Sequence, residues 1–353
     1  MPDAASTSVV SGGSGTRLGG VDALRLIAVT GVIVIHLQPK DEPMRGLEQF
    51  CRSFSVSFFY MAAFFFLARQ LSREAPAGPL FQRRIRQLLI PYLAWTAIYM
   101  LARLAKHLST YVWPDSVGDW LQLVCFGGAA LHLYFLPALM AGTALSFALA
   151  PLARRLRWGW LPLLGAVALL PFAGMIHQAA FRLLVAPLPE NLLIRIVALA
   201  ADTLPYILVA FGSLGFVKKY EANPSGRWGG ALMLGAGLTL ALSAGYAPVP
   251  GLEPILTPLC GCLVFFGSLF LSGAFPDRPW LTRLGRAVFG VYLVHHLLIE
   301  GFEMVANRYH SSWLETYHRP QILVMTLLVF TASVVLSVGF QERIWPRFTR
   351  RPA

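Results

Sequence analysis

The stretch Gly20-Val-Asp-Ala-Leu-Arg-Leu-Ile-Ala-Val-Thr-Gly-Val-Ile-Val-Ile-His36 places a carboxylate, a guanidinium and an imidazole in an otherwise apolar run. In an α-helix, Arg25 and His36 share one face, because their spacing at about 100° per residue amounts to roughly three turns. They lie about 16 Å apart along the axis, which is half or more of a hydrocarbon core of roughly 30 Å. Asp22 lies one turn before Arg25, close enough to pair with it.

The composition is that of an integral membrane protein. Of the 353 residues, 56% are hydrophobic and only 13% are charged, and the mean hydropathy is +0.60. A soluble domain carries about 25% charged residues. The net charge of +12 comes from short basic clusters between apolar runs rather than from one solvated face. This distribution favours a lipid bilayer surface and an anionic cytosolic ligand over nucleic acid.

Apolar stretches of about 17–25 residues are long enough to cross a bilayer. They cover residues 21–38, 53–71, 87–105, 131–152, 159–176, 195–217, 229–246, 254–274, 285–305 and 320–340. The segment 117–128 is too short to span, so we expect an interfacial or re-entrant piece there. The sequence therefore predicts an all-α integral membrane protein, built as a single bundle of about ten transmembrane helices.

The distribution of Lys and Arg among the loops predicts on which side of the membrane the two termini lie. Most Lys and Arg residues outside the spans fall in the loops on the side of the two termini. By the positive-inside rule, both termini are expected to be cytoplasmic. We expect a flexible N-terminal tail at 1–17, a transmembrane domain at 18–341 and a basic cytoplasmic tail at 342–353. The N-terminal tail lacks the pattern of a cleaved signal peptide.

Two residues of the first span are the leading catalytic candidates. His36 is suited to general base chemistry, since an unperturbed imidazole has a pKa near 6.5. Its position near a predicted helix end is equally compatible with a histidine that is simply hydrated. Arg25 lies deeper, and an ionisable residue at such depth usually faces a cavity or a partner. The simpler alternative is an Asp22–Arg25 pair that only fixes the position of the helix.

The sequence Phe81-Gln-Arg-Arg-Ile-Arg-Gln87 leads into the third span. Clustered guanidinium groups bind phosphates, which suits a nucleotide-bearing donor such as coenzyme A. Arg83 and Arg86 are one turn apart and can hold one ligand, whereas Arg84 points elsewhere on the helix. The alternative is a topology signal that also binds anionic lipid.

Other polar residues in or near the spans are candidates for lining a substrate cavity. They are Asp22, His132, Tyr134, Asp202, Tyr292, His295 and Glu300. Tyr292 and His295 can share a face, whereas His296 is expected to point away. Interface anchoring and structural hydrogen bonds are the alternatives. We expect no metal site, and the sequence contains no zinc-ligand motif, nucleophile elbow or Walker loop.

Taken together, these motifs resemble the membrane-bound acyltransferase-3 family, whose first helix carries Arg, ten residues and then His. Arg25 and His36 match that motif, and Asp22-Ala-Leu precedes it as in the family. Further similarity lies in Phe58–Phe64, Arg83–Arg86, His132–Leu136 and Phe289–His295. The resemblance covers nearly the whole chain, from about Leu18 to the last span.

The resemblance implies transfer of an acyl group, often acetyl, from cytosolic acyl-CoA to a hydroxyl of a cell-envelope carbohydrate. It implies a protein of the bacterial inner membrane, with acyl-CoA as a donor substrate and no tightly bound cofactor. His36 would act as general base or as a transient acyl carrier, and Arg25 would face the donor's path. Two alternatives remain at this point. One is a transporter or exporter of a polysaccharide or small anionic solute, and the other is a non-catalytic membrane subunit.

Overall fold

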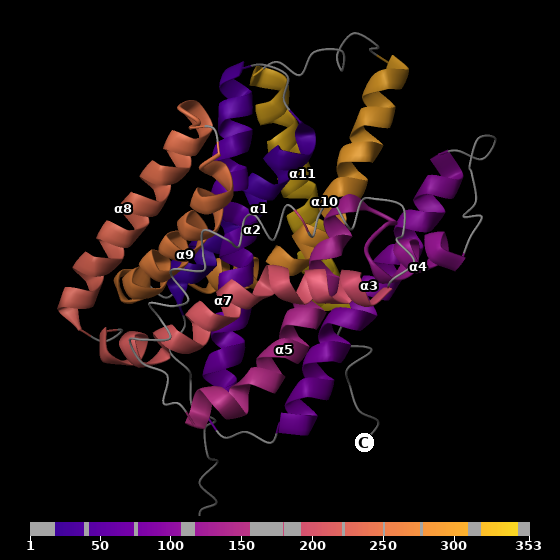
Figure 1. Ribbon diagram of the computed structural model, residues 1–353. Helices are drawn as coiled ribbons and strands as arrows, with labels where there is room; N and C mark the ends of the chain where they lie inside the picture. The colour runs from indigo at the N-terminus through magenta and orange to yellow at the C-terminus, as the bar shows by residue number, and fades with distance from the viewer. Residues whose placement is uncertain are drawn as a thin grey trace, which may run out of the picture.

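The computed structural model describes residues 18–38, 42–73, 77–106, 117–155, 179, 192–220, 223–249, 251–275, 278–309 and 319–344. Over these ranges the chain forms helices and no strands (Figure 1). The elements are α1 (Gly19–Leu37), α2 (Glu42–Leu71), α3 (Ala77–Lys106), α4 (Val117–Cys125), η1 (Leu131–Tyr134), α5 (Phe135–Arg155), α7 (Leu192–Tyr220), α8 (Pro224–Tyr246), α9 (Glu253–Leu271), η2 (Ser272–Ala274), α10 (Pro279–Tyr309), α11 (Arg319–Gly339) and η4 (Phe340–Ile344).

In the described part of the chain, nine helices are long and apolar enough to cross a membrane. They correspond to nine of the predicted spans, which confirms a multi-pass membrane protein. The tenth predicted span, 159–176, lies outside the described residues. Some predicted starts are wrong: α2 begins at Glu42 instead of 53, and α10 at Pro279 instead of 285. Polar residues extend these helices, as where Arg52 pairs with Glu48 across one turn of α2.

The segment predicted as too short to span is the short helix α4, of nine residues, followed by a tight turn. Gly127 in this turn has φ 78°, and its N–H donates to the Tyr92 hydroxyl at 2.8 Å. A Cβ atom at Gly127 would lie 2.4 Å from the backbone nitrogen of Tyr134. Glycine is therefore required here, both for its left-handed conformation and for this close approach. The turn directs the chain into η1, which carries His132.

The helix α2 lies at the centre of the bundle. It packs against α1, α5, α7, α8 and α9. Small residues allow the close approach: a Cβ at Gly261 of α9 would lie 2.2 Å from the Cβ of Ser57, and one at Gly31 of α1 would lie 2.5 Å from Ser55 Oγ. In turn, α1 packs against α9, α10 and α11. The first helix is thus held among four others, which turns its polar face towards the bundle interior.

Candidate active site

Four histidine rings meet where α1, η1 and α10 come together. The ring centroid of His36 lies 5.8 Å from that of His132, 5.2 Å from that of His295 and 5.2 Å from that of His296. The His132 ring lies 5.0 Å from His295 and stacks on His296 at 5.3 Å. We call these four residues the histidine cluster. No other histidine is present among the described residues.

Several ring nitrogens of the cluster are buried without a hydrogen-bond partner in the described part of the chain. His132 and His295 are 2% and 0% exposed. His295 Nδ1 donates to the Tyr292 carbonyl at 2.6 Å, because a carbonyl can only accept. Its Nε2, both ring nitrogens of His132 and Nδ1 of His296 have no hydrogen-bond partner among the described residues. Buried polar atoms are nearly always satisfied, so this unused capacity marks a place where a ligand or water belongs.

Two tyrosines brace the cluster. The Tyr99 hydroxyl of α3 donates to the Leu293 carbonyl at 3.0 Å and accepts from the Leu297 N–H at 3.1 Å. The hydroxyl therefore lies between a carbonyl and an N–H group that would hydrogen-bond to each other in a regular α-helix. Such an insertion distorts a helix locally. The Tyr292 hydroxyl donates to the His132 carbonyl, which ties α10 to η1.

The expectation that His296 points away from the site is wrong. Its ring lies as close to His36 as that of His295, and the His295 and His296 rings are 6.3 Å apart. Adjacent residues on a helix diverge by about 100°, so two of them can flank a ring that lies between them. His36 occupies that place, at the end of α1.

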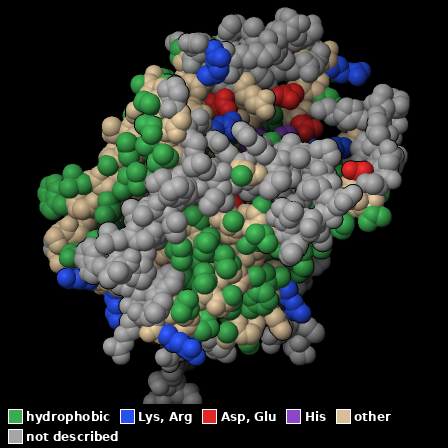
Figure 2. All heavy atoms as spheres, viewed as in Figure 1, with side chains coloured by type: hydrophobic (Ala, Val, Ile, Leu, Met, Phe, Trp, Pro, Cys, Tyr) green, Lys and Arg blue, Asp and Glu red, His purple; other side chains and the backbone are tan. Residues whose placement is uncertain are grey.

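His296 also has an acidic partner. Its Nδ1 lies 3.3 Å from Glu300 Oε1, one turn further along α10, and the two side chains are 24% and 30% exposed. This edge of the cluster is therefore open, unlike the side formed by His132 and His295. Figure 2 shows histidine at the floor of a recess near the top of the view, with acidic side chains around it.

A second polar group lies towards the other end of α1. Arg25 Nη1 donates to Asp22 Oδ1 at 3.0 Å, and its guanidinium lies 5.4 Å from the ring centre of Phe66 on α2. The Arg84 guanidinium acts electrostatically on that of Arg25, and Arg84 Nε is buried without a hydrogen-bond partner in the described part of the chain. Asp22 thus pairs with Arg25, whereas the positive charge of Arg84 is available to an anion.

The other two arginines of the predicted phosphate site are placed differently. Arg83 and Arg86 are exposed at the start of α3, whereas Arg84 is half-buried. The structure therefore brings Arg84 to Arg25. A joint grip of Arg83 and Arg86 on one ligand stays a prediction.

Asp202 belongs to a buried network next to the cluster. It is 3% exposed, and its Oδ2 accepts from the Tyr60 hydroxyl at 3.3 Å. Tyr206, one turn further along α7, shares a hydrogen bond of 2.9 Å with Ser57. Tyr134 is half-buried and interacts electrostatically with Asp202. These contacts tie α7 and α2 together beside the site.

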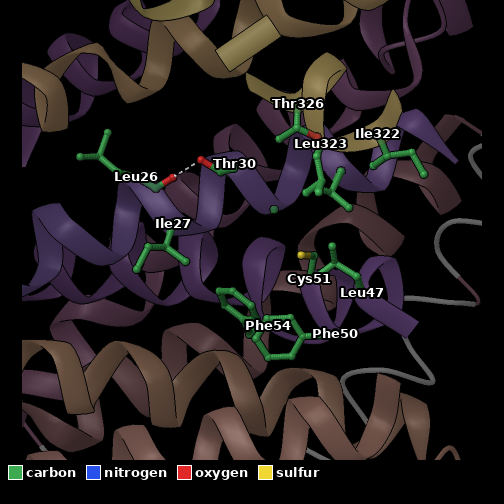
Figure 3. Close-up of a pocket in the computed structure, with 12 residues that line it drawn as sticks. Leu26, Ile27, Thr30, Leu47, Phe50, Cys51, Phe54, Ile322, Leu323 and Thr326 are labelled. Atoms are coloured by element: carbon green, nitrogen blue, oxygen red, sulfur yellow. Dashed lines mark hydrogen bonds between the residues drawn. The ribbon is translucent and has the colours of Figure 1, made fainter. Parts of the chain in front are cut away.

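An apolar groove lies on the opposite face of α1. It has a volume of about 400 Å³ and is formed by α1, α2 and α11 (Figure 3). The labelled lining residues include Leu26, Ile27 and Thr30, whose hydroxyl donates to the Leu26 carbonyl at 2.9 Å. Because these residues are roughly half a turn from Arg25 and His36, the groove does not connect those two side chains.

The structure thus sorts the candidates into neighbouring groups. His36, His132, Tyr292, His295 and Glu300 come together around the histidine cluster. Asp202 and Tyr134 lie beside it, whereas Asp22 and Arg25 lie towards the start of α1, where Arg84 of α3 interacts electrostatically with Arg25.

Sequence reasoning missed three contributors: His296, Tyr99 and Tyr60. The spacing of His296 and Glu300, one helical turn, is a signal that was present in the sequence. No comparable signal identifies Tyr99 or Tyr60, whose partners are distant in the chain.

In comparisons with known proteins, a family model described as an acyltransferase domain, acyltransferase-3, matches residues 18–340. No curated protein and no solved structure matches the chain. The chemistry of the cluster is compatible with the matched family, because an imidazole nitrogen can accept either a proton or an acyl group.

Proposed function

The chain belongs to the acyltransferase-3 family, and on that premise we propose that it moves an acetyl group from cytosolic acyl-CoA to a hydroxyl of a cell-envelope carbohydrate. The observation that carries this proposal is the arrangement along α1. Arg25 lies beside a second guanidinium, and His36, about 16 Å further along the axis, enters the histidine cluster. The guanidinium groups suit the anionic donor, and the histidine cluster suits the neutral hydroxyl group of the acceptor.

For the donor, guanidinium groups recognise phosphates through charge-assisted hydrogen bonds. Arg25 and Arg84 would contact the donor inside the bundle, and Arg83 and Arg86 would hold its phosphates at the exposed start of α3. Calorimetry with acetyl-CoA tests this assignment. Replacing Arg83 and Arg86 with Gln should weaken binding without altering membrane insertion. Unchanged affinity would leave these two arginines as topology signals.

For the acceptor, His36 is the residue that reacts with the acyl group or with the hydroxyl proton. It acts either as general base or as transient acyl carrier. The partly exposed side of the cluster, where His296 and Glu300 lie, would admit the sugar. Asp202 and Tyr134 are placed to line the acceptor's side of the cavity.

We place the protein in a bacterial inner membrane with both termini in the cytoplasm. In Figure 2, basic side chains without acidic neighbours gather at the lower end of the view. The last turn of α5 carries Arg154 and Arg155, and the last turn of α7 carries Lys218 and Lys219. Positive charge of this kind is typical of the cytoplasmic side. The donor would then enter near Arg25, and the acceptor would meet His36 near the outer face.

The test is acyl transfer by the purified protein in liposomes. Radiolabelled acetyl-CoA serves as the donor and de-O-acylated envelope polysaccharide of the host cell as the acceptor. His36→Ala should lower transfer by about 10²–10⁴-fold, the usual contribution of a positioned base. Thr30→Ala is the matched control, since Thr30 lies on the groove side of the same helix, and its activity should stay unchanged.

Two results would contradict the proposal. One is His36→Ala protein that transfers acetyl groups as fast as the unmodified protein. The other is movement of a solute across the liposome membrane without consumption of acetyl-CoA, which is the behaviour of a transporter.

A further inference from the structure

His296 differs from the other three members of the histidine cluster in its electrostatic partner. Within the described residues, it alone among the four has a carboxylate at ion-pairing distance, Glu300 Oε1 at 3.3 Å. The groups that face His296 are His36 from α1, His132 from η1, Tyr99 from α3, and His295 and Glu300 from its own helix. Only the last of these carries a negative charge at neutral pH.

The Glu300 carboxylate distinguishes His296 from the other three imidazoles. A carboxylate beside an imidazole stabilises the imidazolium that forms when the ring takes up a proton. The 3.3 Å contact between His296 Nδ1 and Glu300 is electrostatic, because Nδ1 has no hydrogen-bond partner in the described part of the chain.

His36 lies among the other three imidazoles, and a charged group that acts on it electrostatically is the guanidinium of Arg52 instead of a carboxylate. A ring that stays neutral keeps a lone pair, and a neutral nitrogen lone pair is what a nucleophile needs. The geometry therefore separates a ring that can hold a proton from a ring that can attack a carbonyl.

We propose that His296, paired with Glu300, is the base that takes the acceptor's proton, and that His36 carries the acyl group. This inference rests on the acyl transfer proposed above. First, a His36 nitrogen attacks the thioester carbonyl, the C–N bond forms and the C–S bond breaks. The thiolate then takes the proton from the other His36 nitrogen, which gives free coenzyme A and a neutral acyl-imidazole.

In the second step the acceptor hydroxyl gives its proton to a ring nitrogen of His296, and its oxygen attacks the acyl carbon. The C–O bond forms and the bond from the acyl carbon to His36 breaks. His296 returns its proton to the departing His36 nitrogen, so His296 ends as it began. His36 ends neutral, with its proton on the nitrogen that carried the acyl group, and exchange of that proton with water restores the starting tautomer. The ring centroids of His36 and His296 are 5.2 Å apart, so the proton moves only a short distance between them.

The two half-reactions provide the experiment. Protein in liposomes is mixed with radiolabelled acetyl-CoA alone, quenched after one turnover and analysed for label on the chain by peptide mass spectrometry. De-O-acylated envelope polysaccharide is then added, and release of the label is followed. The variants are His36→Ala, His296→Gln, Glu300→Gln and Glu300→Asp. Glu303→Gln, which removes a charge one turn along the same helix, is the control.

We expect His36→Ala to take up no label. His296→Gln should take up label at the normal rate but pass it to the polysaccharide about 10²–10⁴-fold more slowly. Glu300→Gln should slow only this second step, by roughly ten- to a hundredfold. Glu300→Asp should recover part of the loss, because it restores the negative charge, and Glu303→Gln should behave as the unmodified protein.

Full transfer by His296→Gln would overturn the assignment of the base. Loss of label uptake in His296→Gln, or turnover by the unmodified protein without any labelled chain, would overturn the division of roles. These results differ from a failure of the proposed function, in which the unmodified protein transfers no acetyl group to the polysaccharide at all.

Discussion

Replacing Tyr99 with Phe removes one oxygen atom from the brace between α3 and α10. The Tyr99 hydroxyl takes part in two hydrogen bonds, to the Leu293 carbonyl at 3.0 Å and from the Leu297 N–H at 3.1 Å. These two backbone groups are four residues apart on α10. After the substitution they can bond to each other directly, as in an ordinary helical turn.

This re-pairing sets the magnitude of the effect on stability. Each hydrogen bond contributes about 0.5–1.5 kcal/mol net. Since two bonds are lost and one is regained, the loss of stability should be only about 1 kcal/mol. The effect on activity should be larger, because closing this turn shifts His295 and His296, which lie inside it. A displacement on the order of 1 Å costs about 10²-fold in rate.

The assay compares acyl transfer with thermal unfolding of the same purified protein in detergent. We expect Tyr99→Phe to lower kcat by roughly ten- to a hundredfold, with a small change in Tm. Tyr309→Phe is the control, because Tyr309 is exposed near the end of α10 and should show neither effect. A clear loss of Tm with unchanged kcat would refute the reasoning, since it would show that the hydroxyl stabilises α10 without positioning the histidines.

Three further predictions follow from the packing. Asp202→Ala leaves the buried Tyr60 hydroxyl without its acceptor and should cost about 1–3 kcal/mol in thermal unfolding; adding Tyr60→Phe should recover part of this loss, whereas additive losses would argue against the pair. Gly127→Ala should cost at least about 1–2 kcal/mol, because φ is 78° and the new Cβ would lie 2.4 Å from a backbone nitrogen of η1; Gly229→Ala, with open space around it, should be tolerated. Cys125 is the only exposed cysteine of the four, so a maleimide should modify that residue alone in the folded protein, and a second labelled peptide would contradict this packing.

The membrane spans were largely predictable from the sequence. A helix in hydrocarbon must be apolar over its full length, so each span has a local composition signal. The early starts of α2 and α10 were not predictable in this way. Outside the hydrocarbon a helix can continue through polar residues, and pairs such as Arg52 with Glu48 support it there.

The candidate site was predictable only where both residues lie on one helix. Asp22 and Arg25 form the expected ion pair, because one helical turn brings them together in any tertiary structure. Helical spacing also placed Arg25 and His36 on one face. The prediction for His296 was wrong for a different reason. Helical spacing assigns two adjacent residues to different faces, and it does not take into account a ring from a neighbouring helix, here His36, that contacts both of them.

The first helix shows which features follow from the sequence and which depend on the tertiary structure. The sequence alone determined that α1 crosses a membrane, that it carries Arg25 and His36 on one side, and that these two cannot touch along a straight helix. Periodicity is a property of the local backbone, so it can be read without any partner. Only the tertiary structure decided what meets His36: a ring from η1, two rings from α10 and, through His296, the carboxylate of Glu300. The ring contacts of His36 join residues more than ninety positions apart, and the close packing of the helices decides them.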